Sequence, residues 1–422
     1  MNLKFNFSEI PEQNQLLEFQ KQYSNKWEDF KRITEDENFG FFKLVENNEY
    51  LSSCQEIYNK FQHKKHFVHI GIGGSSLGPE MLVSALKKDT CSRNFTFINN
   101  IDPDQLHSQL KNIDIKESLF YFVSKSGGTA ETIAIFSILI NHFNISNNEL
   151  KDYFVICTDQ NNGEMREIVN DFNLSSLPVP SNIGGRFSVL TPVGLFPALF
   201  ADIKIQQIYQ GAQQYAQDIT SSDPESNSLM QAATFLAFLK KHKSINQTVL
   251  MPYSSKLRDL SFWFVQLWAE SLGKKFSKDN KIVNEGFTPI PGYGATDQHS
   301  QMQLFMEGPY DKCLVLIEVE HFQHCYPLNN SFNAKSLKSL APYSLNQLIQ
   351  AELKGTLRAL QDAQRPFINI SIDNNNEQNL GALILFFESL TVLMGEFLSI
   401  NPFDQPGVEL GKKYAYEVLG QN

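Results

Sequence analysis

Two glycine- and serine-rich loops constrain the fold of this chain most, because each lies between a short apolar run and an amphipathic stretch. The first loop spans residues 71–78 (GIGGSSLG) and follows the apolar run 67–70, and the second spans 124–129 (SKSGGT) and follows the run 119–123. A loop between a strand and a helix presents backbone N–H groups and hydroxyls at the positive end of the helix dipole. The pattern therefore predicts two phosphate-binding turns at neighbouring strand ends of a parallel sheet.

The first loop departs from both common nucleotide-binding motifs. A P-loop requires Lys-Ser or Lys-Thr after its last glycine, but Pro79 and Glu80 follow Gly78. A dinucleotide-binding fingerprint requires a glycine three residues after Gly73, where this chain has Ser76. ATP and NAD are therefore disfavoured, and a small phosphorylated molecule is the expected ligand. Either loop alone also fits glycines that only make a tight turn, but two loops in one series favour a phosphate site.

Composition excludes several classes of protein. The net charge of −10, without a basic tract, argues against a nucleic-acid surface, so no nucleic-acid partner is expected. The five cysteines are scattered and odd in number, which is typical of a reduced, cytoplasmic protein. The apolar segment 380–400 contains Glu388 and Glu396, so it is predicted to be a buried helix and not a membrane span.

Apolar and amphipathic segments alternate along most of the chain. Strands are predicted near 66–71, 95–99, 118–124, 153–158, 247–252, 313–319 and 366–372, and helices at 79–88, 130–143, 227–242, 257–272 and 380–399. This alternation predicts an α/β fold of two doubly wound, parallel-sheet domains with helical N- and C-terminal segments. The expected units are a helical arm (1–45), a first domain (46–205), a second domain (206–400) and a C-terminal helix (401–422).

Candidate catalytic side chains lie outside the two loops. Arg186 follows Gly184 and Gly185, where the backbone can approach a ligand and a guanidinium can stabilise an oxyanion; an ordinary surface ion pair is the alternative. Gln266 and Glu270 are four residues apart, so they share one face of an otherwise apolar helix. A carboxylate there suits a general base, although a helix-surface glutamate without a function is equally open.

Two further segments carry polar groups. His299 lies in a polar, glycine-containing loop, where a histidine either titrates usefully or has no role. Near the C-terminus, Asp404 is a predicted N-cap and Pro406 fits the first helical turn. Gln405 and Lys412 are expected on one helix face roughly 10 Å long. No metal site is expected, because neither histidine grouping has a complete ligand spacing: His63, His66 and His69, and His321, His324 and Cys325.

Together these motifs resemble the glucose-6-phosphate isomerase (phosphoglucose isomerase) family in its shorter bacterial form. The resemblance runs in order from about residue 67 to 413, and its most specific parts are GGRFS at 184–188 and DQPGVELGK at 404–412. It implies two sugar-isomerase (SIS) domains with the active site between them, and a reaction that interconverts glucose 6-phosphate and fructose 6-phosphate in glycolysis and gluconeogenesis. It also implies chemistry without a metal, nucleotide or other cofactor.

The resemblance implies a role for each matching residue. Glu270 would move the proton between C2 and C1, Arg186 would stabilise the cis-enediolate, and His299 and Lys412 would open the sugar ring. The remaining residues would bind the substrate, mostly at its phosphate: Gly74, Ser75, Ser124, Lys125, Ser126, Thr129, Gly185, Gln266 and Gln405. The family also implies a homodimer in which the His299 loop completes the site of the neighbouring subunit. No membrane partner is implied.

The chain departs from many relatives at Gly127 and Gly128, where threonine is frequent, and at Asn182 and Ile183. These differences bear on phosphate affinity and leave the expected reaction type unchanged. Two other classes fit less well. A sugar-phosphate-sensing regulator would carry a DNA-binding module, and a ketose-phosphate amidotransferase would need an N-terminal cysteine where Asn2 stands. The sequence leaves open whether mannose 6-phosphate is also turned over.

Overall fold

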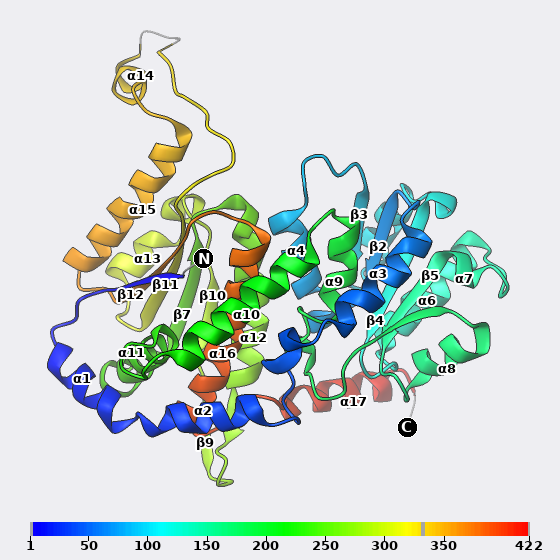
Figure 1. The fold of residues 1–422 in the computed structure, drawn as a ribbon, viewed down its shortest axis with the longest axis horizontal. Coiled ribbons are helices and arrows are strands. Elements are labelled where there is room, and N and C mark those ends of the chain that lie inside the picture. Colours follow the sequence, from blue (N-terminus) through cyan, green and yellow to red (C-terminus); the bar gives the residue numbers. More distant parts are fainter. Residues whose placement is uncertain (1–2, 331–333, 421–422) are drawn as a thin grey trace.

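Two five-stranded sheets organise the chain, each within its own lobe, and the two lobes lie side by side (Figure 1). The computed structural model describes residues 3–330 and 334–420. The predicted α/β class is confirmed, because most strand pairs are parallel and helices cover the sheets. The seven strands predicted from the sequence are all present. The domain boundaries expected at residues 45, 205 and 400 remain predictions.

The first sheet is entirely parallel, and its strand order explains where the two glycine loops meet. Its strands are β2 (His66–Ile70), β3 (Asn94–Ile98), β4 (Ser118–Ser124), β5 (Phe154–Thr158) and β6 (Ser175–Pro178), in the order β3-β2-β4-β5-β6. The chain passes from β2 to β3 on one side and returns as β4 on the other. The order therefore reverses between β2 and β4, which is where open α/β sheets bind ligands.

Helices of the first lobe follow the strands that they connect. They are α3 (Glu49–Phe61), α4 (Leu77–Leu86), α5 (Pro103–Leu110), α6 (Ala130–Phe143), α7 (Leu150–Tyr153) and α8 (Glu164–Phe172). The strands β2, β4 and β5 are buried along their whole length, which explains their unbroken apolar runs. Cys157 is a fully buried thiol on β5.

The second sheet contains one antiparallel strand at its edge. Its members are β1 (Lys4–Phe7), β12 (Phe367–Ile372), β11 (Lys312–Val319), β7 (Gln247–Pro252) and β10 (Thr288–Pro291), in that spatial order. The N-terminal segment forms the expected helices α1 (Gln13–Gln22) and α2 (Asn25–Glu35), but the prediction of a purely helical arm is wrong for β1. Leu3, Phe5 and Phe7 alternate with polar residues, which is the period of a strand.

Five long helices fill the space between and behind the sheets: α9 (Pro192–Phe200), α10 (Ile205–Ser221), α11 (Ser228–Lys243), α12 (Arg258–Leu272) and α16 (Glu377–Phe397). The helix α16 is the one described helix long and apolar enough to cross a membrane, and 94% of its apolar window is buried within the protein. It is therefore the buried core helix that the sequence predicts. A Cβ atom at Gly381 would overlap the Ile208 carbonyl, so α10 and α16 pack backbone to backbone.

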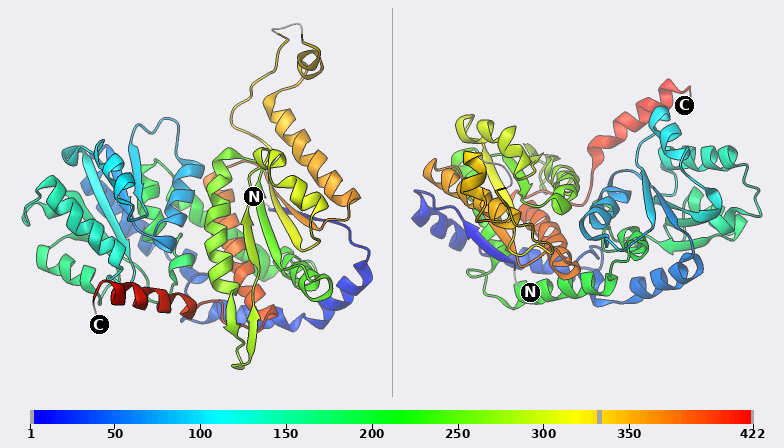
Figure 2. Two further views of the ribbon diagram at one scale, coloured as in Figure 1. Left: turned by 180° about the vertical axis from the view of Figure 1, so that it is seen from behind. Right: turned by 90° about the horizontal axis from the view of Figure 1, so that it is seen from above.

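Three elements project from this body (Figures 1 and 2). The pair α14 (Lys335–Leu340) and α15 (Leu345–Asp362) extends from the second lobe, with α13 (Met302–Glu307) at its base. A hairpin of β8 (Lys274–Phe276) and β9 (Ile282–Glu285) follows α12. The C-terminal helix α17 (Glu409–Val418) lies beside the first lobe, and every residue from 404 to 420 is exposed.

Candidate active site

Three loops converge at the carboxyl ends of the first sheet, after β2, β4 and β6. The first loop forms a short 3₁₀ turn (Gly73–Ser75) before α4. A Cβ atom at Gly74 would overlap the Gly185 carbonyl, so these two loops touch through their backbones. Gly73 has a φ of +60°, and a Cβ atom there would lie 3.0 Å from Gln266 Nε2 on α12. Glycine is required at both positions because the loop is pressed between two neighbours.

Arg186 is the centre of this cluster and is only 3% exposed. Its Nη1 donates to Glu270 Oε2 (3.2 Å) and to Gln405 Oε1 (2.7 Å). The other donors reach Ser271 Oγ (2.7 Å, from Nε) and the carbonyls of Pro402 (2.8 Å) and Asp404 (2.9 Å, both from Nη2). Burial lowers the pKa of Arg186 and the nearby Glu270 charge opposes this shift. The alternative of a surface ion pair is therefore wrong.

Glu270 faces the cluster from the last turn of α12. Its Oε1 accepts a hydrogen bond from Gln266 Nε2 at 3.3 Å, as the four-residue spacing predicts. The neighbouring helix positions Trp263, Leu267 and Trp268 are buried, so the helix is fixed by its apolar face. The Glu270 side chain is 33% exposed. One side of the carboxylate is thus held by Arg186 while the other remains open to a small molecule.

The second loop gathers hydroxyl groups before α6. Ser124 Oγ and Thr129 Oγ1 are 2.8 Å apart, and Ser126 Oγ is 3.5 Å from the same threonine hydroxyl. Lys125 Nζ donates to the Ser181 and Ile183 carbonyls at 2.9 and 2.8 Å, which ties this loop to the segment before Gly184. Burial lowers the pKa of Lys125. The hydroxyls therefore lie at the N-terminus of α6, where a helix also presents free backbone N–H groups.

The first loop is supported by a buried histidine that no sequence motif marks as a site residue. His69 is fully buried on β2, and its Nε2 lies 2.6 Å from the Ser75 carbonyl, so the Nε2–H tautomer donates to that oxygen. Burial lowers the pKa of His69 to about 4. The only signal in the sequence was a lone histidine within an apolar strand, directly before the loop.

The C-terminal segment differs from its predicted geometry. Gln405 and Lys412 do not share a helix face: residues Pro406–Val408 form a 3₁₀ turn, and α17 begins at Glu409. Pro406 explains the difference, because a proline disfavours helical backbone in the residue before it, and Gln405 is not helical (φ −150°, ψ 61°). The prediction of Asp404 as an N-cap is also wrong, since Gln405 occupies that position and makes no side-chain cap.

Two predicted catalytic residues lie apart from the cluster. Lys412 is 64% exposed and pairs with Glu409 on its own helix at 2.9 Å. His299 is exposed at the end of a 3₁₀ turn (Thr296–His299). Within the described residues, no hydrogen bond or ion pair joins His299 to another predicted site residue. Its neighbour Gln298 is anchored, because Nε2 donates to Tyr253 Oη (2.7 Å) and Thr356 Oγ1 (2.8 Å).

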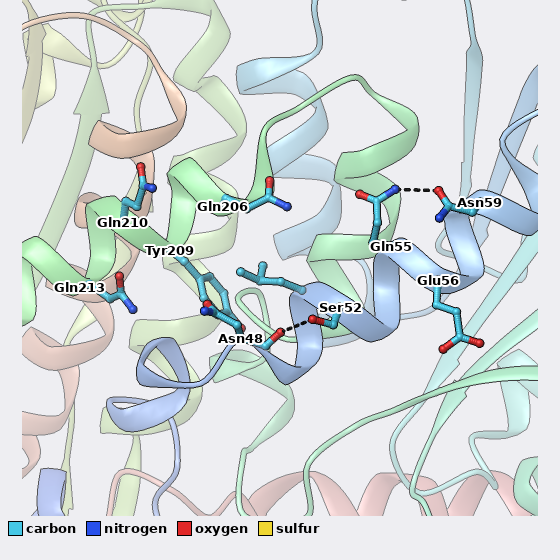
Figure 3. Close-up of a pocket in the computed structure, with 10 residues that line it drawn as sticks. Asn48, Ser52, Gln55, Glu56, Asn59, Gln206, Tyr209, Gln210 and Gln213 are labelled. Atoms are coloured by element: carbon cyan, nitrogen blue, oxygen red, sulfur yellow. Dashed lines mark hydrogen bonds between the residues drawn. The ribbon is translucent and has the colours of Figure 1, made fainter.

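A separate open groove of about 690 Å³ lies between α3 and α10 (Figure 3). Its lining carries one carboxylate, Glu56, and no lysine or arginine. Six carboxamides line it: Asn48, Gln55, Asn59, Gln206, Gln210 and Gln213. The groove contains none of the predicted site residues and lacks a cation for a phosphate, so the converging loops are the candidate active site.

Known proteins resemble this chain in both sequence and fold. A family model described as Phosphoglucose isomerase matches residues 43–422. The chain belongs to the phosphoglucose isomerase family. It is 35% identical to a glucose-6-phosphate isomerase of Carboxydothermus hydrogenoformans over 96% of this chain and 89% of the relative. It is 33% identical to a probable glucose-6-phosphate isomerase of Methanococcus maripaludis, over 99% and 94% of the two chains. The chain is therefore an isomerase that interconverts glucose 6-phosphate and fructose 6-phosphate.

Solved structures place the fold among phosphosugar isomerases. A hypothetical protein of Thermus thermophilus superposes with a TM-score of 0.90 at 29% identity, over 99% of this chain and 100% of that chain. A tagatose-6-phosphate ketose/aldose isomerase of Escherichia coli shares the fold with a TM-score of 0.55 at 14% identity, over 91% and 94% of the two chains. The SIS-type architecture that the sequence predicts is confirmed.

Proposed function

We propose that Glu270 is the base that moves the proton during this isomerisation. After the ring opens, its carboxylate removes the proton from C2, the electron pair of that C–H bond forms the C1–C2 double bond, and the π electrons of the C1 carbonyl move to O1, which gives a cis-enediolate. The hydroxyl proton passes from O2 to O1, the C2 carbonyl forms as the C1–C2 double bond breaks, and the same carboxyl group returns its proton to C1, so no proton is gained or lost overall. The contact that carries the proposal is the 3.2 Å pairing of Glu270 with buried Arg186, which leaves the carboxylate one-third exposed.

Arg186 is proposed to stabilise the enediolate oxygens. Its guanidinium is fixed by five acceptors before substrate arrives, so the positive charge needs no reorganisation when negative charge develops. The substrate phosphate is assigned to the two glycine loops and to the residue that follows Asp404. The residues proposed for binding are Gly74, Ser75, Ser124, Lys125, Ser126, Thr129, Gly185, Gln266 and Gln405.

His299 and Lys412 are proposed to open the ring, in a site shared between two subunits of a homodimer. One group takes the proton from the C1 hydroxyl and the other gives a proton to O5 as the C1–O5 bond breaks. The exposure of His299 supports this proposal: its neighbour Gln298 is anchored, and within the described residues no hydrogen bond or ion pair joins His299 to another proposed site residue. The helix α17 also exposes an apolar stripe that a second copy would cover: Leu410, Tyr414 and Val418.

A cytoplasmic location is proposed on the state of the cysteines. All five thiols are free in the structure, and four of them are buried: Cys54, Cys91, Cys157 and Cys313. Free thiols persist in reducing compartments.

A hybrid-dimer experiment tests the assigned roles and the shared site together. Glu270→Gln and His299→Ala proteins should each lose at least ~10³ of turnover while remaining folded, because each lacks one proton-transfer group. After unfolding and refolding in equal amounts, about half the dimers are mixed, and each has one intact site. Roughly a quarter of wild-type activity should therefore return.

If His299 and Glu270 of the same chain serve one active site, every site of the mixed dimer lacks one of the two groups. Activity then stays as low as that of each single mutant. That result, with hybrids confirmed by native mass spectrometry, would exclude the shared site. If Glu270→Gln alone keeps more than a tenth of wild-type turnover, Glu270 is not the base.

A further inference from the structure

Lys274 is a buried cation directly behind the proposed base. Its side chain is only 6% exposed, at the start of β8 and two residues past the end of α12. Its Nζ donates to the Glu270 carbonyl at 2.6 Å. This carbonyl is among the last four of α12, which have no partner within the helix, and a cation also stabilises the negative end of a helix dipole.

The same ammonium reaches the C-terminal segment. Lys274 Nζ also donates to the Asp404 carbonyl at 2.5 Å and lies 3.4 Å from the Asp404 carboxylate. Arg186 Nη2 donates to that Asp404 carbonyl from 2.9 Å. Two buried cations therefore share one backbone oxygen, and this oxygen immediately precedes Gln405.

We propose that Lys274 is a positioning residue that holds the segment carrying Gln405 and Lys412 in register with the helix carrying Glu270. This inference rests on the proposed function of those three residues. Phe403 packs against Phe39, with ring centroids 4.1 Å apart, but residues 404–420 are all exposed. Beyond Phe403, Asp404 and Gln405 are held by polar contacts to these two cations. Loss of Lys274 would leave Arg186 as the one cation on the Asp404 carbonyl, and Gln405 would sample other positions.

A purely structural alternative is that Lys274 only caps the C-terminus of α12. The two roles predict different losses. A cap affects the stability of α12 and the whole fold, whereas a positioning contact affects the segment 403–412 and substrate affinity. Amide hydrogen exchange of 403–412 and the KM for fructose 6-phosphate therefore separate them.

The test compares Lys274→Met with Lys275→Met. Lys275 is the adjacent, exposed lysine, so the control makes the same substitution without removing the contacts. We expect Lys274→Met to raise KM about tenfold and to speed exchange in 403–412 about tenfold, since the charge-assisted hydrogen bond from Lys274 to this segment is lost. The control should match wild type. Lys274→Arg should restore part of both losses.

Unchanged KM and exchange in 403–412, with only a lower Tm, would overturn the positioning role and leave the cap. If Lys274→Met does not fold, Lys274→Gln keeps a neutral donor and gives the same comparison. The exchange measurement needs no activity. A wild-type protein without isomerase activity would therefore contradict the proposed function. The amide hydrogen exchange of residues 403–412 would still decide whether Lys274 holds that segment.

Discussion

Arg186 and Lys412 are two cations assigned to one reaction, yet their surroundings are opposite. Arg186 is almost fully buried and donates to five acceptors from two segments of the chain, the end of α12 and residues 402–405. Lys412 is 64% exposed, and among the described residues its one ion pair is with Glu409, one turn away on α17. The proposed roles account for this difference. A group that stabilises an enediolate must be fixed beforehand, whereas a group that opens the ring acts on C1 and O5 before the enediolate forms and is proposed to lie in a site that a second subunit completes.

The largest loss of turnover and stability is expected from substitution of the buried Arg186. Arg186→Lys keeps the charge but has three donors and no planar fork, so several buried acceptors lose their partner. Turnover should fall about 10²- to 10³-fold, and the Tm should fall by several degrees. Steady-state kinetics and calorimetry measure both. Arg32→Lys, on the exposed face of α2, is the matched control and should change neither. Loss of activity with an unchanged Tm would show that the buried contacts do not stabilise the fold.

Substitution of the exposed Lys412 should lower activity without lowering stability. Lys412→Ala should lower turnover about 10²-fold, as expected for loss of one acid–base group. Its Tm should stay within about one degree of wild type, because an exposed surface pair contributes little. The control is Lys413→Ala, the next residue on α17, which pairs with Glu417 and should keep full activity. Equal losses in the two variants would remove Lys412 from the ring-opening step.

The hydroxyl loop should show a third pattern, in which affinity changes more than turnover. The double variant Ser124→Ala, Thr129→Ala removes two hydroxyls 2.8 Å apart. The phosphate is bound in both the ground and transition states, so KM should rise about 10- to 100-fold with a smaller change in kcat. Ser108→Ala with Thr220→Ala removes two exposed hydroxyls elsewhere and serves as the control. An unchanged KM would place the phosphate outside this loop.

Substitution of His69 is expected to have the smallest effect on activity at neutral pH. Its effect on the pH dependence of stability extends the comparison of buried and exposed groups. Its pKa is about 4 in the folded protein and about 6.5 when unfolded. As the pH falls, His69 is therefore protonated in the unfolded chain before it is protonated in the folded protein. The free energy of unfolding is highest above pH 6.5 and decreases as the pH falls toward 4. The expected loss is about 3 kcal/mol. Urea unfolding at pH 7, 5.5 and 4 measures it.

His69→Gln keeps a donor for the Ser75 carbonyl and cannot take up this proton. We expect the variant to lose about 3 kcal/mol less stability than wild type across the same pH range. The control is His63→Gln, which replaces an exposed histidine and should follow wild type. Identical pH profiles for His69→Gln and wild type would mean that His69 is already charged or accessible in the folded state.

Local sequence determined much of the fold and the first elements of the site. The alternation of apolar runs and amphipathic stretches predicted seven of the ten strands in the two five-stranded sheets, and it missed the short strands β1, β6 and β10. The glycine loops fell at the ends of β2 and β4, because such loops join a strand to a helix within a few residues. The spacing of Gln266 and Glu270 placed both on one face of α12. In each case the deciding interactions lie within one or two turns of chain, where residue type and spacing are sufficient.

Tertiary structure alone decided the rest. Arg186 was a candidate from the sequence, but its burial depends on partners 84 to 219 residues away along the chain. His69 contacts one backbone carbonyl and Lys274 contacts two, and such contacts leave no pattern in the sequence. Gln405 is not on the predicted helix face because Pro406 follows it and because Arg186 and Lys274 bind the carbonyl of the residue before it. A contact between distant segments depends on how whole elements pack, and neither periodicity nor propensity records that packing.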